Sequence, residues 1–274
     1  MKLTRRTTFS SGHRYWLEDR TPEENRRLFG RWASPYNHGH DYALEATVEG
    51  PVNPQTGMVI NIKDVDAILH NRIVEKFNLK SINDEVPEFK TLPPSLENLA
   101  SFIWNKLSDW PGDIQLSRVC LYETPALFTD VTMQGGELKV TLTRVYEFCA
   151  SHRLHSPDLS ENENREVFGK CNNPHGHGHN YELEVTVCGP IDPVTGMMAD
   201  LEKIDHVVDA EVVDRYDHKH LNIDLPELSG LIPTTEIMTR VIWKRLVGKL
   251  PAKLERIMLR ETARSSFEYA GEDE

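Results

Sequence analysis

Two histidines separated by a single glycine can hold a metal ion. His177 and His179 flank Gly178 in a segment that alternates like a β-strand, and residues two apart on a strand point to the same face. His152, on the preceding predicted strand, can supply a third imidazole. Three neutral imidazoles with a fourth position left open are typical of a catalytic zinc site. The spacing therefore predicts Zn²⁺ bound by His152, His177 and His179.

The same arrangement occurs a second time, 139 residues earlier in the chain. A lone His-x-His pair is more often an ordinary strand feature, but its repetition in register favours metal binding. We therefore expect a second candidate metal site at His13, His38 and His40. His175 extends the later run of histidines, yet its counterpart is Tyr36, which is a poor metal ligand, so His175 is not expected to bind the ion.

The repeat extends along the whole chain and predicts two copies of one domain. A constant offset relates residues 9–14 to 148–153, 24–26 to 163–165, 29–30 to 168–169, 38–42 to 177–181, 56–58 to 195–197 and 103–104 to 242–243. We expect a first domain at 1–134 and a second at 135–274. The Gly-Gly pair at 135–136 predicts a tight turn between them rather than a flexible linker.

The elements that must position the histidines follow from hydrophobic periodicity. Residues 140–148 and 181–187 alternate as half-buried strands do. Apolar residues with helical spacing occur over 65–77 and over 99–107, the latter after a Pro-Pro-Ser start signal at 93–95. Each copy is therefore predicted as an α+β domain with the order ββααββ and an antiparallel sheet.

Composition excludes several classes of protein. The 274 residues include 31 basic and 43 acidic side chains, a net charge of −12, which argues against general nucleic-acid binding. The sequence lacks an apolar run long enough to span a membrane and a secretory signal at its start. Its four cysteines are scattered, which favours free thiols. We expect a cytoplasmic protein without nucleic-acid or membrane partners.

Several motifs of the second copy resemble the 6-pyruvoyl-tetrahydropterin synthases and the closely similar 6-carboxytetrahydropterin synthases of queuosine precursor synthesis. These motifs are FCASHRL at 148–154, FGKCNNP at 168–174, HGHNY at 177–181, DHK at 217–219 and ET at 261–262. The first copy resembles the family in its fold and zinc motif only. The resemblance implies the tunnelling fold (T-fold), in which three domains close a barrel of antiparallel strands and two barrels stack.

The resemblance also implies a zinc-dependent lyase that converts 7,8-dihydroneopterin triphosphate to 6-pyruvoyl-tetrahydropterin with loss of triphosphate. Zinc would polarise the hydroxyls of the substrate side chain and so make a neighbouring C–H more acidic. By analogy, Cys171 is the base that removes the proton. Asp217 and His218 complete a proton relay, which in the family comes from a neighbouring domain.

Three further residues are expected to bind the substrate by the same analogy. Glu261 would anchor the pterin ring, because a carboxylate matches the paired N–H donors of its aminopyrimidine edge. Thr234 and Thr235 would assist. These two threonines follow a proline and also fit the N-terminal cap of a helix.

The first copy lacks the residues that would carry out catalysis by this analogy. Trp32, Asn78 and Leu79 stand where the second copy has its proposed base and relay, whereas Glu123 matches Glu261. We expect no turnover in the first copy. It could be a structural partner or a regulatory pocket for metal and pterin.

The sequence leaves the identity of the product open. Five residues separate Cys171 from His177, which resembles the pyruvoyl-forming pattern, and the carboxy-forming enzymes have a shorter gap. A 6-carboxytetrahydropterin synthase and a non-catalytic zinc–pterin binding protein are the alternatives.

If a barrel needs three domains, three chains would form a homotrimer that mimics a hexamer, with one ring of first copies stacked on one of second copies.

Overall fold

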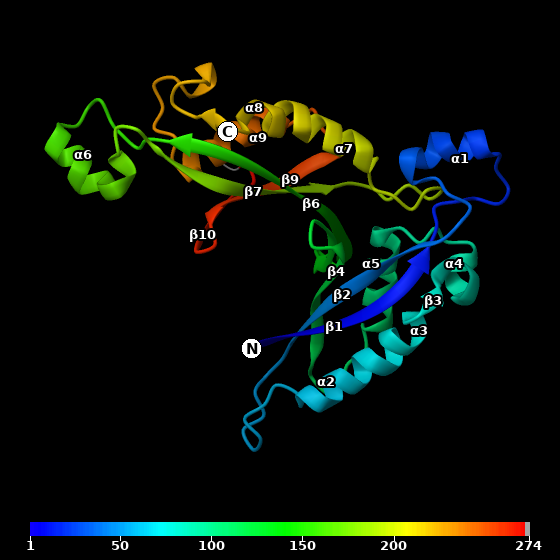
Figure 1. Ribbon diagram of the computed structural model, residues 1–274. Coiled ribbons are helices and arrows are strands. Elements are labelled where there is room, and N and C mark those ends of the chain that lie inside the picture. Colours follow the sequence, from blue (N-terminus) through cyan, green and yellow to red (C-terminus); the bar gives the residue numbers. More distant parts are fainter. Residues whose placement is uncertain (272–274) are drawn as a thin grey trace. The chain divides into compact units, whose positions relative to one another are not determined.

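The computed structural model describes residues 1–271, which form two compact units (Figure 1). Unit 1 consists of Met1–Thr143 together with the segment Cys188–Glu202, and unit 2 of Arg144–Val187 and the described residues from Lys203 onward. Strands of a large sheet and helices packed against them make up both units, so the predicted α+β class is confirmed. In the described part of the chain, no helix combines the length and apolar character that crossing a membrane requires.

Unit 1 contains a mostly antiparallel sheet. In spatial order its strands are β5 (Leu127–Gln134), β4 (Gln115–Thr124), β2 (His38–Glu49), β1 (Lys2–His13) and the two-residue β3 (Lys80–Ser81), which pairs in parallel with β1. β1 and β2 pair along their full length, and their register places His13 opposite His38. The first candidate metal site therefore lies at one end of this strand pair.

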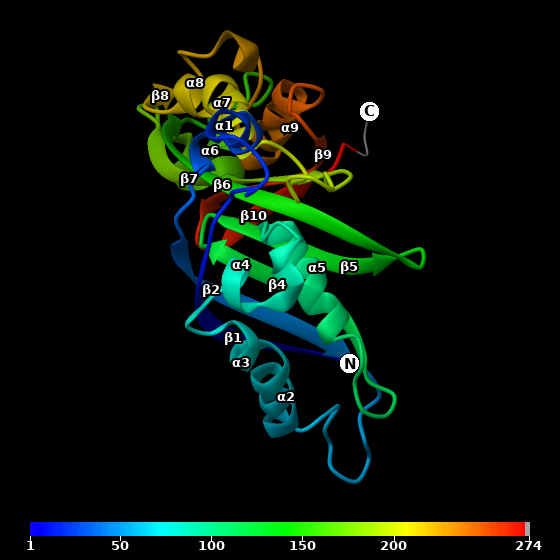
Figure 2. The same ribbon diagram turned by 90° about the vertical axis from the view of Figure 1, so that its right-hand side faces the viewer.

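Helices cover the unit 1 strands, as the periodicity predicted (Figure 2). Helices α2 (Ile62–Leu69) and α3 (Glu75–Phe77) contact β1 and are joined by the π-helical turn His70–Val74. Helix α5 (Leu96–Lys106) contacts β4 and β5 and buries Leu99 and Ile103 completely. The shorter elements are the 3₁₀ turn Gly30–Trp32, α4 (Ile82–Glu85) and the 3₁₀ turn Pro87–Lys90.

Unit 2 has the corresponding elements. Its strands, in spatial order, are β10 (Ser265–Tyr269), β9 (Lys253–Thr262), β7 (His177–Cys188) and β6 (Glu137–His152), with β8 (Lys219–His220) parallel to β6. Its helical elements are α6 (Glu161–Phe168), the 3₁₀ turn Gly169–Asn172, α7 (Leu201–Val208), the π-helical turn Asp209–Val213, α8 (Asp214–Tyr216), the 3₁₀ turn Pro226–Leu228 and α9 (Thr235–Leu246). α9 packs on β9 and β10.

The turn between the two copies is as tight as predicted. β5 ends at Gln134 and β6 begins at Glu137, and the two residues between them, Gly135 and Gly136, have φ angles of 60° and 88°. Two successive positive φ angles suit a two-residue hairpin and favour glycine. The first residues of β6 belong to unit 1, and the strand continues into unit 2 from Arg144.

The order ββααββ was too simple, because an additional helix stands between the first two strands of each repeat. In the first repeat it is α1 (Pro22–Phe29), which begins with a capping box between Thr21 and Glu24. Its counterpart α6 begins with a capping box between Ser160 and Glu163. The Thr/Ser-x-x-Glu signal was present in the sequence and indicates a helix start.

Candidate metal centres

The structure brings together the three histidines predicted in the second repeat. His152 is the last residue of β6, and His177 and His179 lie at the start of β7. One ring nitrogen from each lies within 4.8 Å of the others, and the Nε2 atoms of His152 and His177 are 3.2 Å apart. Two nitrogens bound tetrahedrally to zinc at about 2.0–2.1 Å would be separated by about 3.3 Å. The spacing of these rings therefore fits a zinc ion.

A backbone carbonyl orients the central imidazole. His152 Nδ1 lies 2.8 Å from the carbonyl oxygen of Pro233, so the ring donates its Nδ1–H there and turns the Nε2 lone pair toward the other histidines. Burial lowers the pKa of His152 and that of His177, which favours the neutral form that a metal ligand must have. Pro233 was not among the site residues predicted from the sequence.

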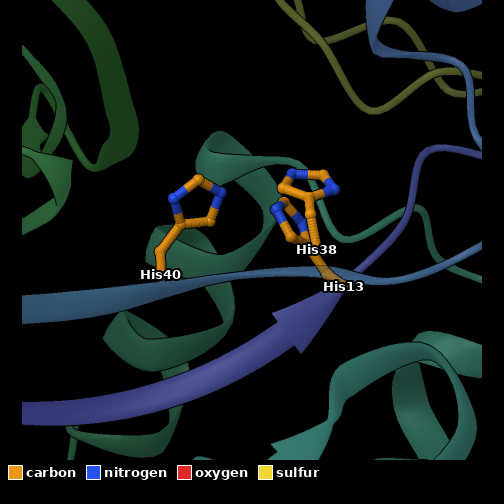
Figure 3. Close-up of side chains that lie close together, drawn as sticks. All are labelled: His13, His38 and His40. Atoms are coloured by element: carbon orange, nitrogen blue, oxygen red, sulfur yellow. The ribbon is translucent and has the colours of Figure 1, made fainter.

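The first repeat contains the same arrangement. Figure 3 shows His13 at the end of β1 and His38 and His40 along β2, with all three rings on one side of the strands. Their ligand atoms lie within 4.8 Å of one another, and His13 Nδ1 is 2.9 Å from the carbonyl oxygen of Pro94. Burial lowers the pKa of His13 to about 3 and that of His40 to about 4. This set of donors also fits zinc.

Some of the buried ring nitrogens in both triads lack a hydrogen-bond partner among the described residues. The Nε2 atoms of His13, His40 and His179 are buried and form no hydrogen bond with any described residue. A buried polar atom without a partner costs free energy, and most such atoms in native proteins are satisfied. A metal ion bound at these nitrogens would satisfy them.

A carboxylate stands beside each triad. Glu261 Oε1 lies 3.4 Å from His152 Nε2 and 3.7 Å from His179 Nε2, and the buried Tyr181 hydroxyl donates to it at 3.4 Å. Glu123 takes the same place in the first repeat, 3.7 Å from His40 Nε2. The sequence indicated Glu261 only as a pterin anchor. The structure places it at the open side of the histidine triad as well.

The first repeat also offers room for a small molecule. A pocket of about 510 Å³ next to its triad is lined by His40 and Glu123 and by Arg6 and Tyr122, among others. The Arg6 guanidinium lies over the Tyr122 ring, 5.3 Å from its centre.

Cys171 lies close to the end of β6 but is not part of the histidine cluster. It is a half-buried free thiol on the 3₁₀ turn after α6. Its carbonyl accepts the backbone N–H of Leu154 at 2.9 Å, two residues beyond His152. The counterpart, Trp32, lies under the Arg31 guanidinium, which is 4.3 Å from the centre of the Trp32 ring.

Asp217 and His218 form a hydrogen-bonded pair. Asp217 Oδ2 lies 2.7 Å from His218 Nδ1, and its Oδ1 accepts the backbone N–H of Cys149 at 2.7 Å. These two contacts lower the pKa of Asp217, the Cys149 N–H being the stronger cause. The His218 side chain is 82% exposed. It lines a pocket of about 470 Å³ to which His179 and Asn180 also contribute.

The first repeat keeps this backbone but not its chemistry. Asn78 Oδ1 accepts the N–H of Ser10, as Asp217 accepts that of Cys149. Leu79 has a φ of 59° and its counterpart His218 a φ of 57°. A positive φ is unfavourable for leucine, and the Leu79 side chain is exposed, so packing does not explain it. The two repeats therefore share this backbone conformation, but only the second repeat has titratable side chains at these two positions.

The two threonines lie at the start of α9. Thr234 is the N-cap residue, and its hydroxyl accepts the N–H of Ile237 at 3.4 Å, which confirms the predicted cap. Thr235 is buried in the first turn. Because Thr234 follows Pro233, this helix start lies beside the carbonyl that orients His152.

Comparison with known proteins agrees with the architecture. The family model described as 6-pyruvoyl tetrahydropterin synthase matches residues 2–134 and again residues 141–272. The 6-pyruvoyl tetrahydrobiopterin synthase of Poecilia reticulata is 47% identical over 132 residues, which are 48% of this chain and 90% of that protein. The human protein of the same name is 41% identical over 139 residues, or 50% of this chain and 96% of that one.

One solved structure is similar to part of the chain. The 6-pyruvoyl tetrahydropterin synthase of Caenorhabditis elegans is 39% identical, with a TM-score of 0.47, over 48% of this chain and 96% of that one. About half of this chain thus covers nearly all of each relative. Because the family model matches both halves in succession, the chain belongs to the 6-pyruvoyl tetrahydropterin synthase family and contains two repeats of it.

Proposed function

We propose that the chain is a zinc-dependent lyase that converts 7,8-dihydroneopterin triphosphate to 6-pyruvoyl-tetrahydropterin and releases triphosphate. The observation that carries the proposal is the second-repeat cluster, in which three imidazoles converge and Glu261 lies 3.4 Å from His152 Nε2. Family membership and the names of the relatives support the same reaction.

The side chains of the second repeat suit the required proton transfers. Bound zinc would supply Lewis acidity to the hydroxyls of the substrate side chain. Cys171 would accept a proton from that side chain. Asp217 holds His218 through Nδ1 at 2.7 Å, which leaves Nε2 to exchange a proton with a substrate bound at a neighbouring domain. Protons move from the side chain to the ring as triphosphate leaves, so the conversion needs no external oxidant.

Glu261 is proposed to anchor the pterin, and its replacement tests this role. An amide in Glu261→Gln has one acceptor oxygen and no charge, so it cannot accept two N–H donors from the ring. Hydrogen bonds to a charged group contribute about 1.5–3 kcal/mol, so we expect kcat/KM to fall about 10- to 100-fold. The matched variant Glu123→Gln in the first repeat should keep wild-type kinetics. An equal loss in both variants would contradict the assignment.

The two repeats are proposed to differ in role, with a non-catalytic domain at 1–134 and a catalytic domain at 135–274. Both triads fit zinc, so the first repeat would hold an ion without turnover. Its Trp32, Asn78 and Leu79 replace the thiol and the relay. A structural ion and a pocket that binds pterin without converting it are both compatible with this site.

The product distinguishes the proposed function from its alternatives. Purified chain, zinc and 7,8-dihydroneopterin triphosphate should yield 6-pyruvoyl-tetrahydropterin, identified by chromatography and mass spectrometry. Formation of 6-carboxytetrahydropterin would instead support the queuosine-pathway enzyme, which the gap between Cys171 and His177 disfavours. Binding of the pterin without product would support the zinc–pterin binding protein.

The proposal also covers the cellular compartment and the oligomeric state of the chain. All four cysteines are free, as the reducing cytoplasm would keep them. We propose a homotrimer, which would replace a hexamer of single domains. A native mass of three chains would support this number, and a mass of two chains would contradict it.

A further inference from the structure

Arg153 directly follows His152 and is held by hydrogen bonds at its backbone and its side chain. Its N–H donates to Asn222 Oδ1 at 2.8 Å, and its carbonyl accepts from the Asn222 amide at 2.9 Å. Its Nε donates to Asn172 Oδ1 at 3.0 Å, and its Nη2 lies 3.1 Å from His155 Nδ1. Although the chain has 43 acidic side chains, none that the structure describes forms an ion pair with this half-buried guanidinium. The cation is thus fixed in place without a carboxylate partner.

The matching arginine of the first repeat is neutralised. Arg14 donates to both carboxylate oxygens of Asp84, from Nη1 at 2.7 Å and from Nη2 at 2.8 Å. Its Nη2 also lies 3.5 Å from a carboxylate oxygen of Glu18. The second repeat has Ile223 at the position of Asp84 and Pro157 at the position of Glu18. Both carboxylates that neutralise the first arginine are therefore missing around the second.

A second cation stands next to the proposed base. Lys170 directly precedes Cys171 on the 3₁₀ turn and is exposed, and it forms no ion pair within the described part of the chain. Asn172, on the other side of the thiol, is the residue that binds the Nε of Arg153. In the first repeat the counterpart of the lysine, Arg31, lies over the ring of the tryptophan that follows it. Cys171 thus lies between a lysine and the asparagine that holds the arginine.

The unused donors of Arg153 suit a phosphate group. A guanidinium has five N–H donors, and the contacts with Asn172 and His155 take one each. The remaining donors lie in one plane and can form paired hydrogen bonds with phosphoryl oxygens. The Lys170 ammonium would add a compact positive charge. These two side chains therefore favour a ligand with several phosphates over a neutral one.

We infer that Arg153 and Lys170 bind the triphosphate group of the substrate in the second repeat. The inference rests on the proposed reaction, in which a C–O bond breaks and the departing triphosphate oxygen keeps the electron pair. Positive charge beside the triphosphate stabilises the negative charge that develops on that oxygen. The first repeat would not bind triphosphate in this way, because the Asp84 carboxylate neutralises Arg14 and repels phosphate.

Two fluorescent ligands separate the triphosphate from the rest of the substrate. Neopterin triphosphate and neopterin, the oxidised analogues, differ only in the triphosphate group. Fluorescence titration of the zinc-loaded chain at constant ionic strength gives a Kd for each, and circular dichroism checks the fold of every variant. The wild type should bind neopterin triphosphate more tightly than neopterin. We expect Arg153→Gln to weaken the binding of neopterin triphosphate about 10- to 100-fold and to leave the Kd of neopterin unchanged.

A second variant changes the charge without removing Arg153. Ile223→Asp places a carboxylate at the position of Asp84, on a side chain that is 76% exposed, so the fold should be kept. It should weaken neopterin triphosphate binding by a similar factor, whereas Ile223→Asn, which has the same size and no charge, should not. Arg14→Gln is the control in the first repeat and should leave both Kd values unchanged. Lys170→Gln removes an exposed charge and should weaken the triphosphate ligand up to about fivefold.

Equal weakening of both ligands in Arg153→Gln would indicate a structural role and overturn the inference. Unchanged binding of neopterin triphosphate in folded Arg153→Gln and Ile223→Asp would overturn it as well, as would a wild type that binds the two ligands equally. The readout is binding rather than turnover. A chain that forms 6-pyruvoyl-tetrahydropterin but binds both ligands equally would contradict only this inference, whereas the expected Kd values without product would contradict only the proposed reaction.

Discussion

Replacing Cys171 with alanine will lower turnover of 7,8-dihydroneopterin triphosphate by about 10²- to 10⁴-fold, the usual contribution of a general base. Cys171 lies on the 3₁₀ turn whose backbone bonds to Leu154, two residues past His152, so its main chain is fixed near the end of β6. Removing one half-buried sulfur leaves the histidines in place. Zinc content and pterin binding should therefore remain at wild-type values while the catalytic step fails.

Cys188→Ala provides the control for the first prediction. Cys188 is also a half-buried cysteine, but it ends β7 at the opposite end of the strand from His177 and His179. The steady-state rate and the zinc content of both variants are measured together. Wild-type turnover in Cys171→Ala would remove this residue as the base, and loss of zinc in that variant would show that its role is structural.

The second prediction separates the two triads. His177→Ala should lose one zinc per chain and about 10³-fold or more in turnover, because Lewis-acid stabilisation contributes several kcal/mol. His38→Ala changes the equivalent residue of the first repeat. It should lose the other zinc and keep its turnover, because Trp32, Asn78 and Leu79 leave that site without a base or relay.

Elemental analysis with parallel rate measurements checks this pair. The wild type should contain two zinc ions per chain and each variant one. One ion per chain in the wild type would contradict the metal site of the first repeat. Equal loss of turnover in His38→Ala and His177→Ala, with both variants folded, would contradict the division of roles.

The histidine triads could be predicted from the sequence because each depends on local rules. Residues two apart on a strand share a face, and His152 on the preceding strand was the candidate third ligand. The 139-residue repeat then favoured metal binding over an ordinary strand feature. The helix start at Ser95 and the turn at 135–136 followed in the same way from residue types with strong conformational preferences.

Features that depend on long-range contacts could not be predicted. The carbonyl of Pro233 meets His152 across 81 residues, and no side-chain type marks a backbone acceptor in the sequence. The place of Glu261 beside His152 depends on how β9 lies against the strands of the triad, which the sequence pattern does not show. The hydrogen bond from Ser95 to the carbonyl of Gly196 was also missed, although the Thr-Gly-Met motif around Gly196 was recognised as part of the repeat.

The backbone conformation at Leu79 and His218 could not be predicted for a different reason. Leu79 and His218 both adopt positive φ, which is uncommon for any residue except glycine and is unfavourable for leucine, so the residue types did not predict it. In the second repeat, the backbone N–H of Cys149 donates to the Asp217 carboxylate, and this contact holds the chain in place next to His218. The Ser10 and Asn78 contact does the same in the first repeat.

Anomalous diffraction at the zinc absorption edge, from crystals of the zinc-loaded chain, tests the central claim most directly. The account predicts a peak about 2.0–2.1 Å from Nε2 of His152, His177 and His179. It also predicts an open side of that ion facing Glu261. Ordered density for the three rings with no peak between them, or rings turned away from one another, would contradict the proposed metal centre and the reaction built on it.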